Sequence, residues 1–134
     1  MHNVIDLPDL ALTELADFGR RAEAEGYDAI VAADRPGSEP LVALAAVAAA
    51  TERIGLVATL LMQPERSTAL LARQAATLDV LSGGRLTVVL EVGHGAPAPP
   101  MRSPERLVEM HADALRAMWT GPVRVEEASQ AVAA

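Results

Sequence analysis

Ile54-Gly-Leu-Val-Ala-Thr-Leu-Leu61 is an apolar run of strand length, and the turn-prone residues Gln63-Pro-Glu-Arg66 follow it. Two similar runs, Tyr27–Ala33 and Leu86–Val92, lie on either side of it in the sequence. Their apolar residues are nearly continuous rather than alternating, which is typical of parallel strands that are covered on both faces. Each run is therefore predicted to be a buried strand of a parallel sheet.

Stretches with helical periodicity separate and follow these runs. The second stretch is apolar almost all round, and a helix without a polar face must be covered on more than one side. Serines precede three of the helices and glycines end three of them, as expected for caps. The four expected helices begin near Leu12, Ser38, Ser67 and Ser103, and they end at Gly26, Thr51, Ser82 and Gly121.

The order of elements predicts an α/β chain of βα repeats. Val4–Leu7 would add a fourth strand, although Asn3, Asp6 and Pro8 count against it. We therefore expect three to four parallel strands with covering helices over residues 1–122. Residues 123–134 are expected to be a mobile C-terminal tail, in which Val123–Val125 could form a short strand.

Composition excludes several classes of function. The 134 residues carry a formal charge of −7, and no basic cluster lies beside aromatic residues, so nucleic acid is not an expected partner. The absence of cysteine excludes disulfides and thiolate metal sites and fits the reducing cytoplasm. The three scattered histidines give no metal signal. The longest apolar run, Pro40–Ala50, is too short for a membrane span, and the acidic start contradicts a signal peptide, so we expect a soluble protein.

Several blocks resemble one family in order and spacing. They are Glu39-Pro-Leu41, Ala48–Thr59, Ala72-Arg73 and Leu78–Arg85. These blocks are similar to the bacterial luciferase-like monooxygenases, and most to the branch that uses reduced FMN to oxidise substrates such as nitrilotriacetate or dibenzothiophene sulfone. The resemblance runs from about Leu12 to Gly121. It implies a TIM barrel that binds reduced flavin at the carboxyl ends of its strands and uses O2 as second substrate.

The expected strands are too few to close such a barrel. A TIM-type (β/α)8 barrel takes eight strands and about 250 residues, so this chain is expected to form about half of one. Half a barrel leaves two sheet edges and an apolar inner face uncovered. We therefore expect a homodimer or a partner chain to complete it. The usual phosphate site, after strands seven and eight, would be missing, which would weaken FMN binding by one chain.

Three residues are candidates for the site, and each has an ordinary structural alternative. Asp34 directly follows its strand, and the resemblance places this position near the flavin; it could instead cap the loop or the next helix. Thr59 ends its strand, where the resembled branch packs on the flavin ring, or it is an ordinary strand threonine. His94 lies between glycines after the third run and could be a general acid or base, or a solvated loop residue.

The sequence also departs from the resembled branch. Arg35 stands where other members have a histidine, and bulky Leu60, Leu61 and Met62 would fill space that a ring needs. Polar flavin contacts of the third strand are replaced by Val89, Val92 and Gly93. Two functions therefore stay open. One is a flavin-dependent oxidoreductase, and the other is a non-catalytic descendant that acts as an oligomeric scaffold, small-ligand binder or regulatory subunit.

Two residues have structural roles in the resembled family. The resemblance implies that Asp79 and Arg85 tie a helix end to a strand start on the side opposite the chemistry. His111 lies on an apolar helix face, which is typical of a core or interface histidine, and Glu91 is assigned no role.

Overall fold

A computed structural model describes residues 3–9, 12–61, 66–92 and 104–127 of the chain. Within these residues, five strands form one parallel sheet in the order β1-β2-β3-β4-β5. The strands are β1 (Val4–Asp6), β2 (Ala29–Ala33), β3 (Gly55–Leu61), β4 (Leu86–Val92) and β5 (Val123–Glu127). The helices are the 3-10 turn η1 (Leu12–Glu14), α1 (Leu15–Ala24), α2 (Pro40–Ala50), α3 (Thr68–Ser82) and α4 (Pro104–Met118).

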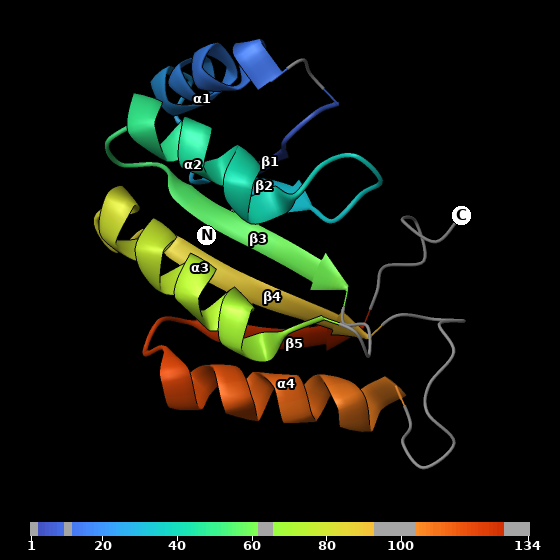
Figure 1. The fold of residues 1–134 in the computed structure, drawn as a ribbon. Coiled ribbons are helices and arrows are strands. Elements are labelled where there is room, and N and C mark those ends of the chain that lie inside the picture. The colour runs from blue at the N-terminus through green and yellow to red at the C-terminus, as the bar shows by residue number, and fades with distance from the viewer. Residues whose placement is uncertain (1–2, 10–11, 62–65, 93–103, 128–134) are drawn as a thin grey trace.

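The strand order explains why the helices gather on one side of the sheet. Each strand lies beside the next one along the chain, and crossovers between parallel strands are right-handed, so every crossover passes over the same face. Figure 1 shows α1 to α4 side by side along the sheet. This single winding is the arrangement of a TIM-type barrel segment, and it confirms the predicted fold class.

The predicted number of strands is wrong. Val4–Asp6 does form a strand, and β5 adds a fifth, so the sheet exceeds the expected three to four. β5 takes the first five residues of the segment that we assigned to a mobile tail. Its sequence alternates valine with charged residues, as in an edge strand with one solvated face, and therefore lacks the continuous apolar pattern of the central strands. The remaining residues, 128–134, lie outside the described part.

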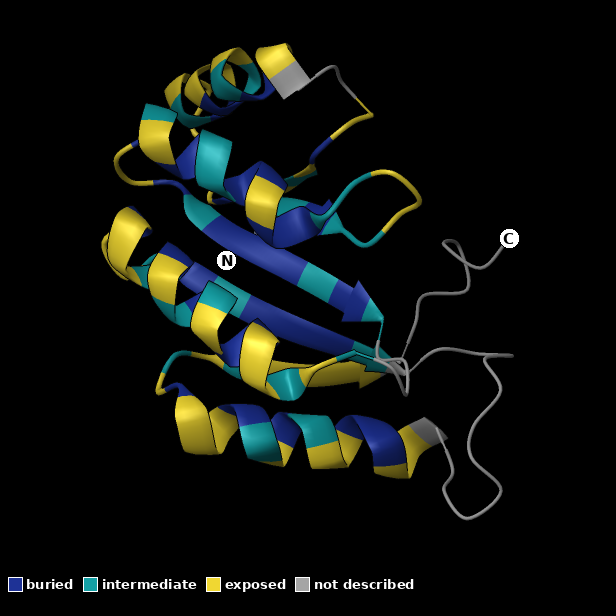
Figure 2. Cartoon of the chain, viewed as in Figure 1, coloured by how far each residue is buried: buried dark blue, intermediate teal, exposed yellow. Residues whose placement is uncertain are grey.

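The two faces of the sheet have different surroundings. Alternate residues such as Leu56, Ala58 and Leu60 point toward the helices and form the main core with them. The opposite, inner face carries a smaller apolar cluster of Ala29, Val57 and Val89, with Val31 packed against it. The central strands are buried along most of their length (Figure 2). Helices thus cover one face of the sheet, whereas the sequence pattern predicted cover on both.

A partly buried arginine links three segments at the amino-terminal side of the sheet. The Arg85 guanidinium donates to the carbonyl oxygens of Ala48, Thr51, Ile54 and Ser82, and to the Thr51 hydroxyl. Two of these carbonyls, those of Ala48 and Thr51, lie at the end of α2, where the regular helical hydrogen bonds run out and only the Ala48 carbonyl oxygen also accepts from a backbone N–H, that of Thr51, at 3.4 Å. The structural role that the resemblance implies for Arg85 is confirmed.

Asp79 has a similar function at the end of α3. Its carboxylate accepts a hydrogen bond of 3.3 Å from the indole N–H of Trp119, which follows α4. Trp119 is 6% exposed, so this bond satisfies a buried donor. Asp79 thus has a structural role, but its side chain ties the end of α3 to the end of α4, whereas the resemblance implied a tie to the start of β4.

Candidate functional site

Asp34 and Thr59 lie together where β2 and β3 end. Ala33 and Thr59 are register partners, and the Asp34 backbone N–H donates to the Thr59 carbonyl oxygen at 3.0 Å. Thr59 alternates with Leu60, so its side chain is on the inner face with Val57. It is half-buried, and its hydroxyl has no hydrogen-bond partner among the described residues. The structure therefore brings these two candidate residues to the same edge of the sheet.

Arg66 was not recognised from the sequence as a member of this edge. It lies between β3 and α3, and its guanidinium forms an ion pair with the Asp34 carboxylate. The two side chains are 24% and 23% exposed. Opposite charges in the loops that follow neighbouring parallel strands could have indicated this pair, because the carboxyl ends of such strands meet at one edge. The ion pair does not decide between a site role and a structural role for Asp34. It orients the carboxylate, as a site would need, and it also gives the carboxylate a protein partner.

His111 is connected to the same region through α3. Its Nδ1 contacts the hydroxyl of Thr68, the first residue of α3. Burial lowers the pKa of His111, and the positive charge of Arg66 lowers it further. His111 is therefore a partnered histidine between two helices, as its apolar helix face predicted.

The inner face of β4 carries Val89 in one row and the acidic Glu91 in the next, and β5 places charged residues beside both. Val89 pairs with Thr59 on one side and with Arg124 on the other. One row further, Glu91 lies between Leu61 and Glu126. Burial raises the pKa of Glu91, and the nearby charge of Glu126 raises it further. Val89 is buried on this face, and Glu91 adds an ionisable group that the sequence left without a role.

The predicted obstruction by bulky residues is only partly correct. Leu60 is fully buried and points to the helices, so it does not occupy the inner face. Leu61, the register partner of Glu91, does lie on that face. Met62 and the candidate acid or base His94 lie outside the described residues, and so does Gly93.

Arg35 has a structural contact at this edge. Its guanidinium donates to the Leu7 carbonyl oxygen at 3.0 Å, which joins the end of β1 to the end of β2. In the described segments, no three histidine or acidic side chains come close enough together to hold a metal ion. None of the helices described there is both long and apolar enough to cross a membrane.

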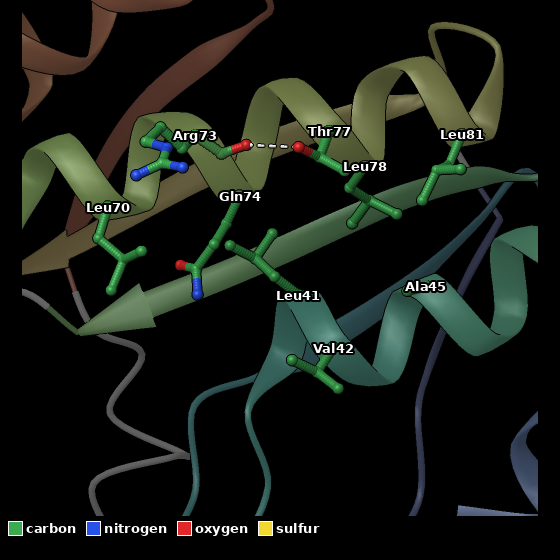
Figure 3. Close-up of a pocket in the computed structure, with 9 residues that line it drawn as sticks. All are labelled: Leu41, Val42, Ala45, Leu70, Arg73, Gln74, Thr77, Leu78 and Leu81. Carbon is green, nitrogen blue, oxygen red and sulfur yellow. Dashed lines mark hydrogen bonds between the residues drawn. The ribbon is translucent and has the colours of Figure 1, made fainter.

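A groove of about 400 Å³ lies between α2 and α3 on the outer side of the helices (Figure 3). Leucines of both helices line it, together with Val42 and Ala45, and its polar members are Arg73, Gln74 and Thr77. Val42, Leu70 and Leu81 are 65%, 53% and 65% exposed. Because the helix layer separates it from the inner face, this groove is distinct from the Asp34 and Thr59 edge.

Comparison with known proteins agrees with this architecture. An uncharacterized protein of Mycobacterium tuberculosis (strain ATCC 25618 / H37Rv) is 34% identical over 90 residues, which cover 61% of this chain and 31% of that protein. The coenzyme F420-dependent tetrahydromethanopterin reductase of Methanopyrus kandleri is 28% identical, with a TM-score of 0.62 over 68% of this chain and 27% of that one.

A third similar protein is a type II Baeyer–Villiger monooxygenase. This oxygenating constituent of 3,6-diketocamphane monooxygenase, from a plasmid of Pseudomonas putida, was solved in complex with FMN. It is 16% identical, with a TM-score of 0.68 over 84% of this chain and 37% of that one. The chain thus spans about a third of the length of the proteins that it matches. The luciferase-like monooxygenase family model matches residues 3–130, and the chain therefore belongs to that family.

Proposed function

We propose that the chain contributes the inner face of a flavin- or deazaflavin-dependent oxidoreductase, with the cofactor ring lying against β2, β3 and β4. The observation that carries this proposal is the Thr59 hydroxyl, which is half-buried at the carboxyl edge without a protein partner among the described residues. Active sites of TIM-type barrels lie at this edge. Family membership supplies the cofactor class: of two similar proteins, one uses F420 and one was solved with FMN.

The residues around Thr59 fit a flat aromatic ring. Ala33 and Val89 flank Thr59 in the register, and Val57 lies behind it on the same strand. This surface is apolar, and the alanine leaves room above it, while the hydroxyl offers one hydrogen bond to a ring heteroatom. The Leu61 side chain would bound the space for the ring at the end of β3. The described residues therefore supply a floor and one polar contact.

The same residues do not supply a phosphate site. Arg66 and Arg35 are cations at this edge, and both are engaged, Arg66 with the Asp34 carboxylate and Arg35 with the Leu7 carbonyl oxygen. Each charge-assisted hydrogen bond to a phosphate contributes about 1.5 to 3 kcal/mol, so binding by this surface alone should be weak. We propose that the phosphate is held by segments beyond the described residues or by another chain.

The cofactor, in its reduced form, would supply the reducing equivalents for the reaction. This chain's own residues would bind and orient the ring. Thr59 would fix its rotation on the strand surface, and the apolar cluster below would exclude water. The Asp34 carboxylate, held by Arg66, would lie at the rim, where it can orient a polar substrate group.

Titration with FMN and with F420, followed by cofactor fluorescence, tests this proposal. Replacing Thr59 with valine keeps the shape and removes the hydroxyl, so we expect the Kd to rise roughly 3- to 10-fold, the equivalent of one hydrogen bond of about 0.5 to 1.5 kcal/mol. Thr77→Val is the matched control, because Thr77 is exposed on α3 and its hydroxyl donates to the Arg73 carbonyl oxygen. Equal affinities for the wild type and Thr59→Val would refute the placement of the ring.

We further propose that another chain completes the barrel: a partner chain would supply three strands to a barrel of eight, whereas two copies of this chain, with five described strands each, would close a sheet of ten. β1 and β5 are the edge strands of the sheet, and Val4 and Val125 on them are 46% and 40% exposed. An isologous contact would pair unsatisfied backbone groups of both edges and cover the inner faces. Light scattering combined with size exclusion measures the mass, and a strict monomer over a range of concentrations would contradict this arrangement.

The second candidate function is a non-catalytic scaffold or regulatory subunit, and the α2–α3 groove favours it. α2 is apolar on all sides, and its outward residue Val42 lines the groove together with the exposed Leu70 and Leu81 of α3. Surfaces of this kind mark protein interfaces. This candidate needs no cofactor, so absence of FMN and F420 binding together with stable self-association would favour it.

Charged substitutions distinguish the two possible interfaces. Leu81→Lys is expected to abolish dimers that form through the α2–α3 groove and to leave dimers that form through the sheet edges unchanged. Met118→Lys is the matched control, because Met118 is 48% exposed on α4 and does not line the groove. A dimer that survives Leu81→Lys would exclude the groove as its interface.

A further inference from the structure

Two side-chain contacts connect the carboxyl edge of the sheet to α4. Asp34, after β2, pairs with Arg66, and Thr68 of α3 contacts His111 of α4. Arg66 and Thr68 stand on either side of Ser67, whose side chain caps α3 by accepting from the Leu70 backbone N–H. The cap fixes the start of the helix and thereby the positions of both neighbours. Four polar side chains thus join the end of β2 to the middle of α4.

Arg66 is the charged group that interacts with both Asp34 and His111. It pairs directly with the Asp34 carboxylate, and its charge also acts on His111, where it adds to burial in lowering the pKa. A neutral His111 leaves Arg66 with one strong electrostatic partner. A proton on His111 would place a second positive charge near Arg66, and a single carboxylate would then have to balance both.

The other charged groups around His111 point elsewhere. On α4 itself, Glu109 and Asp113 form exposed pairs with Arg106 and Arg116. On β4 and β5, the charged side chains of Glu91 and Arg124 lie on the inner face, as their register with Leu61 and Val89 shows. α4, which carries His111, packs on the opposite face of the sheet, against residues such as Val88. Further along α3, Arg73 is exposed and Asp79 accepts from Trp119.

We propose that Arg66 is a positioning residue that holds the Asp34 carboxylate at the site, and that protonation of His111 weakens this hold. The fold favours neutral His111, so the arrangement keeps its full stability above the ordinary histidine value of 6.5 and loses stability as the pH falls below it. The ligand that Asp34 would meet rests on the proposed function. The coupling between His111, Arg66 and Asp34 does not, because it is a property of the free protein.

NMR titration of the His111 ring in the full chain tests the coupling without any cofactor. Arg66→Gln removes the positive charge, so the pKa of His111 should rise toward its ordinary value. Arg66→Lys keeps the charge, and the pKa should stay low. Asp34→Asn leaves Arg66 without its counter-charge, so the pKa should fall below that of the wild type. His111→Gln identifies the resonance.

The control is Arg35→Gln, which removes an arginine from the same edge whose partner is the Leu7 carbonyl oxygen. It should leave the His111 pKa unchanged. A His111 pKa that is the same in the wild type, Arg66→Gln and Arg66→Lys would overturn the proposal. If Asp34→Asn does not fold, the comparison of the His111 pKa in Arg66→Gln and in Arg66→Lys still tests the coupling. Failure of the cofactor titrations would leave this result untouched, so the two proposals fail separately.

Discussion

Replacing Arg85 with methionine should destabilise the fold more than any exposed substitution. The Arg85 guanidinium donates five hydrogen bonds, to acceptors on Ala48, Thr51, Ile54 and Ser82, with distances to the Thr51 hydroxyl and the Ile54 carbonyl oxygen of 2.8 and 3.0 Å. Methionine retains much of the apolar volume and provides none of these donors. The change therefore isolates the hydrogen bonds from the packing.

The expected loss follows from the acceptors that are left behind. Each unsatisfied buried acceptor costs about 1 to 3 kcal/mol, and Arg85 donates to five acceptors, of which the Ala48 carbonyl oxygen also accepts from the Thr51 backbone N–H at 3.4 Å. Arg85 is itself only partly buried, so water will recover some of this loss. We expect a decrease of about 3 to 5 kcal/mol in the free energy of unfolding, which is a large part of the roughly 5 to 15 kcal/mol of a typical domain.

Urea unfolding followed by tryptophan fluorescence measures this loss. Trp119 is the single tryptophan of the chain and is buried, so its emission reports on the transition. Arg20→Met is the control, because Arg20 is 58% exposed and forms only a surface pair with Asp17; it should change stability by less than about 1 kcal/mol. A loss of under 1 kcal/mol for Arg85→Met would refute the reasoning.

Three further substitutions test other parts of the fold. Burial acts to raise the pKa of Glu23, but backbone N–H donors, those of Arg53 and Ile54 among them, outweigh it and lower the pKa. The contribution of Glu23 to the free energy of unfolding should therefore be present at neutral pH and disappear as the pH falls through the folded-state pKa. Urea unfolding of Glu23→Gln at pH 7 should show a loss of about 1 to 2 kcal/mol that vanishes in acid. The raised pKa of Glu91 has the opposite effect on stability, because the charged carboxylate is disfavoured in the folded state. Glu91→Gln should therefore increase thermal stability at pH 7 and have no effect at a pH below the ordinary glutamate pKa. Gly19→Ala places a Cβ 2.9 Å from Val47 Cγ1 where α1 crosses α2, and calorimetry should show a loss of about 1 to 3 kcal/mol; an unchanged melting temperature would contradict this packing.

The central strands could be predicted because their sequences carry a strong signal. The apolar runs around Val57 and Val89 are continuous, and the observed strands β3 and β4 fall within the predicted runs. The serine cap of α3 acts as predicted, since the Ser67 side chain accepts from the Leu70 backbone N–H. The cap expected of Ser38 was wrong: the side chain of the next residue, Glu39, caps α2 by accepting from the Val42 backbone N–H at 2.8 Å. Patterns of this kind depend on neighbours along the chain, which the sequence shows directly.

The remaining features depend on contacts between distant residues. β5 was underestimated because an edge strand buries little, and Arg124 and Glu126 on it resemble loop residues. The ion pair of Asp34 with Arg66 joins residues 32 positions apart, and only the parallel register reveals it. Periodicity likewise could not show that Leu60 points to the helices, because a one-residue difference in phase reverses the face.

Chemical-shift mapping of the amide resonances during titration with FMN and with F420 tests the central claim most directly. We expect the perturbed amides to include those of Asp34, Thr59 and Val89, which surround the inner face at the carboxyl edge, and we expect the α2–α3 groove to remain unaffected. Shifts confined to the groove, or no shifts with either cofactor, would contradict the assignment of this edge as a cofactor site.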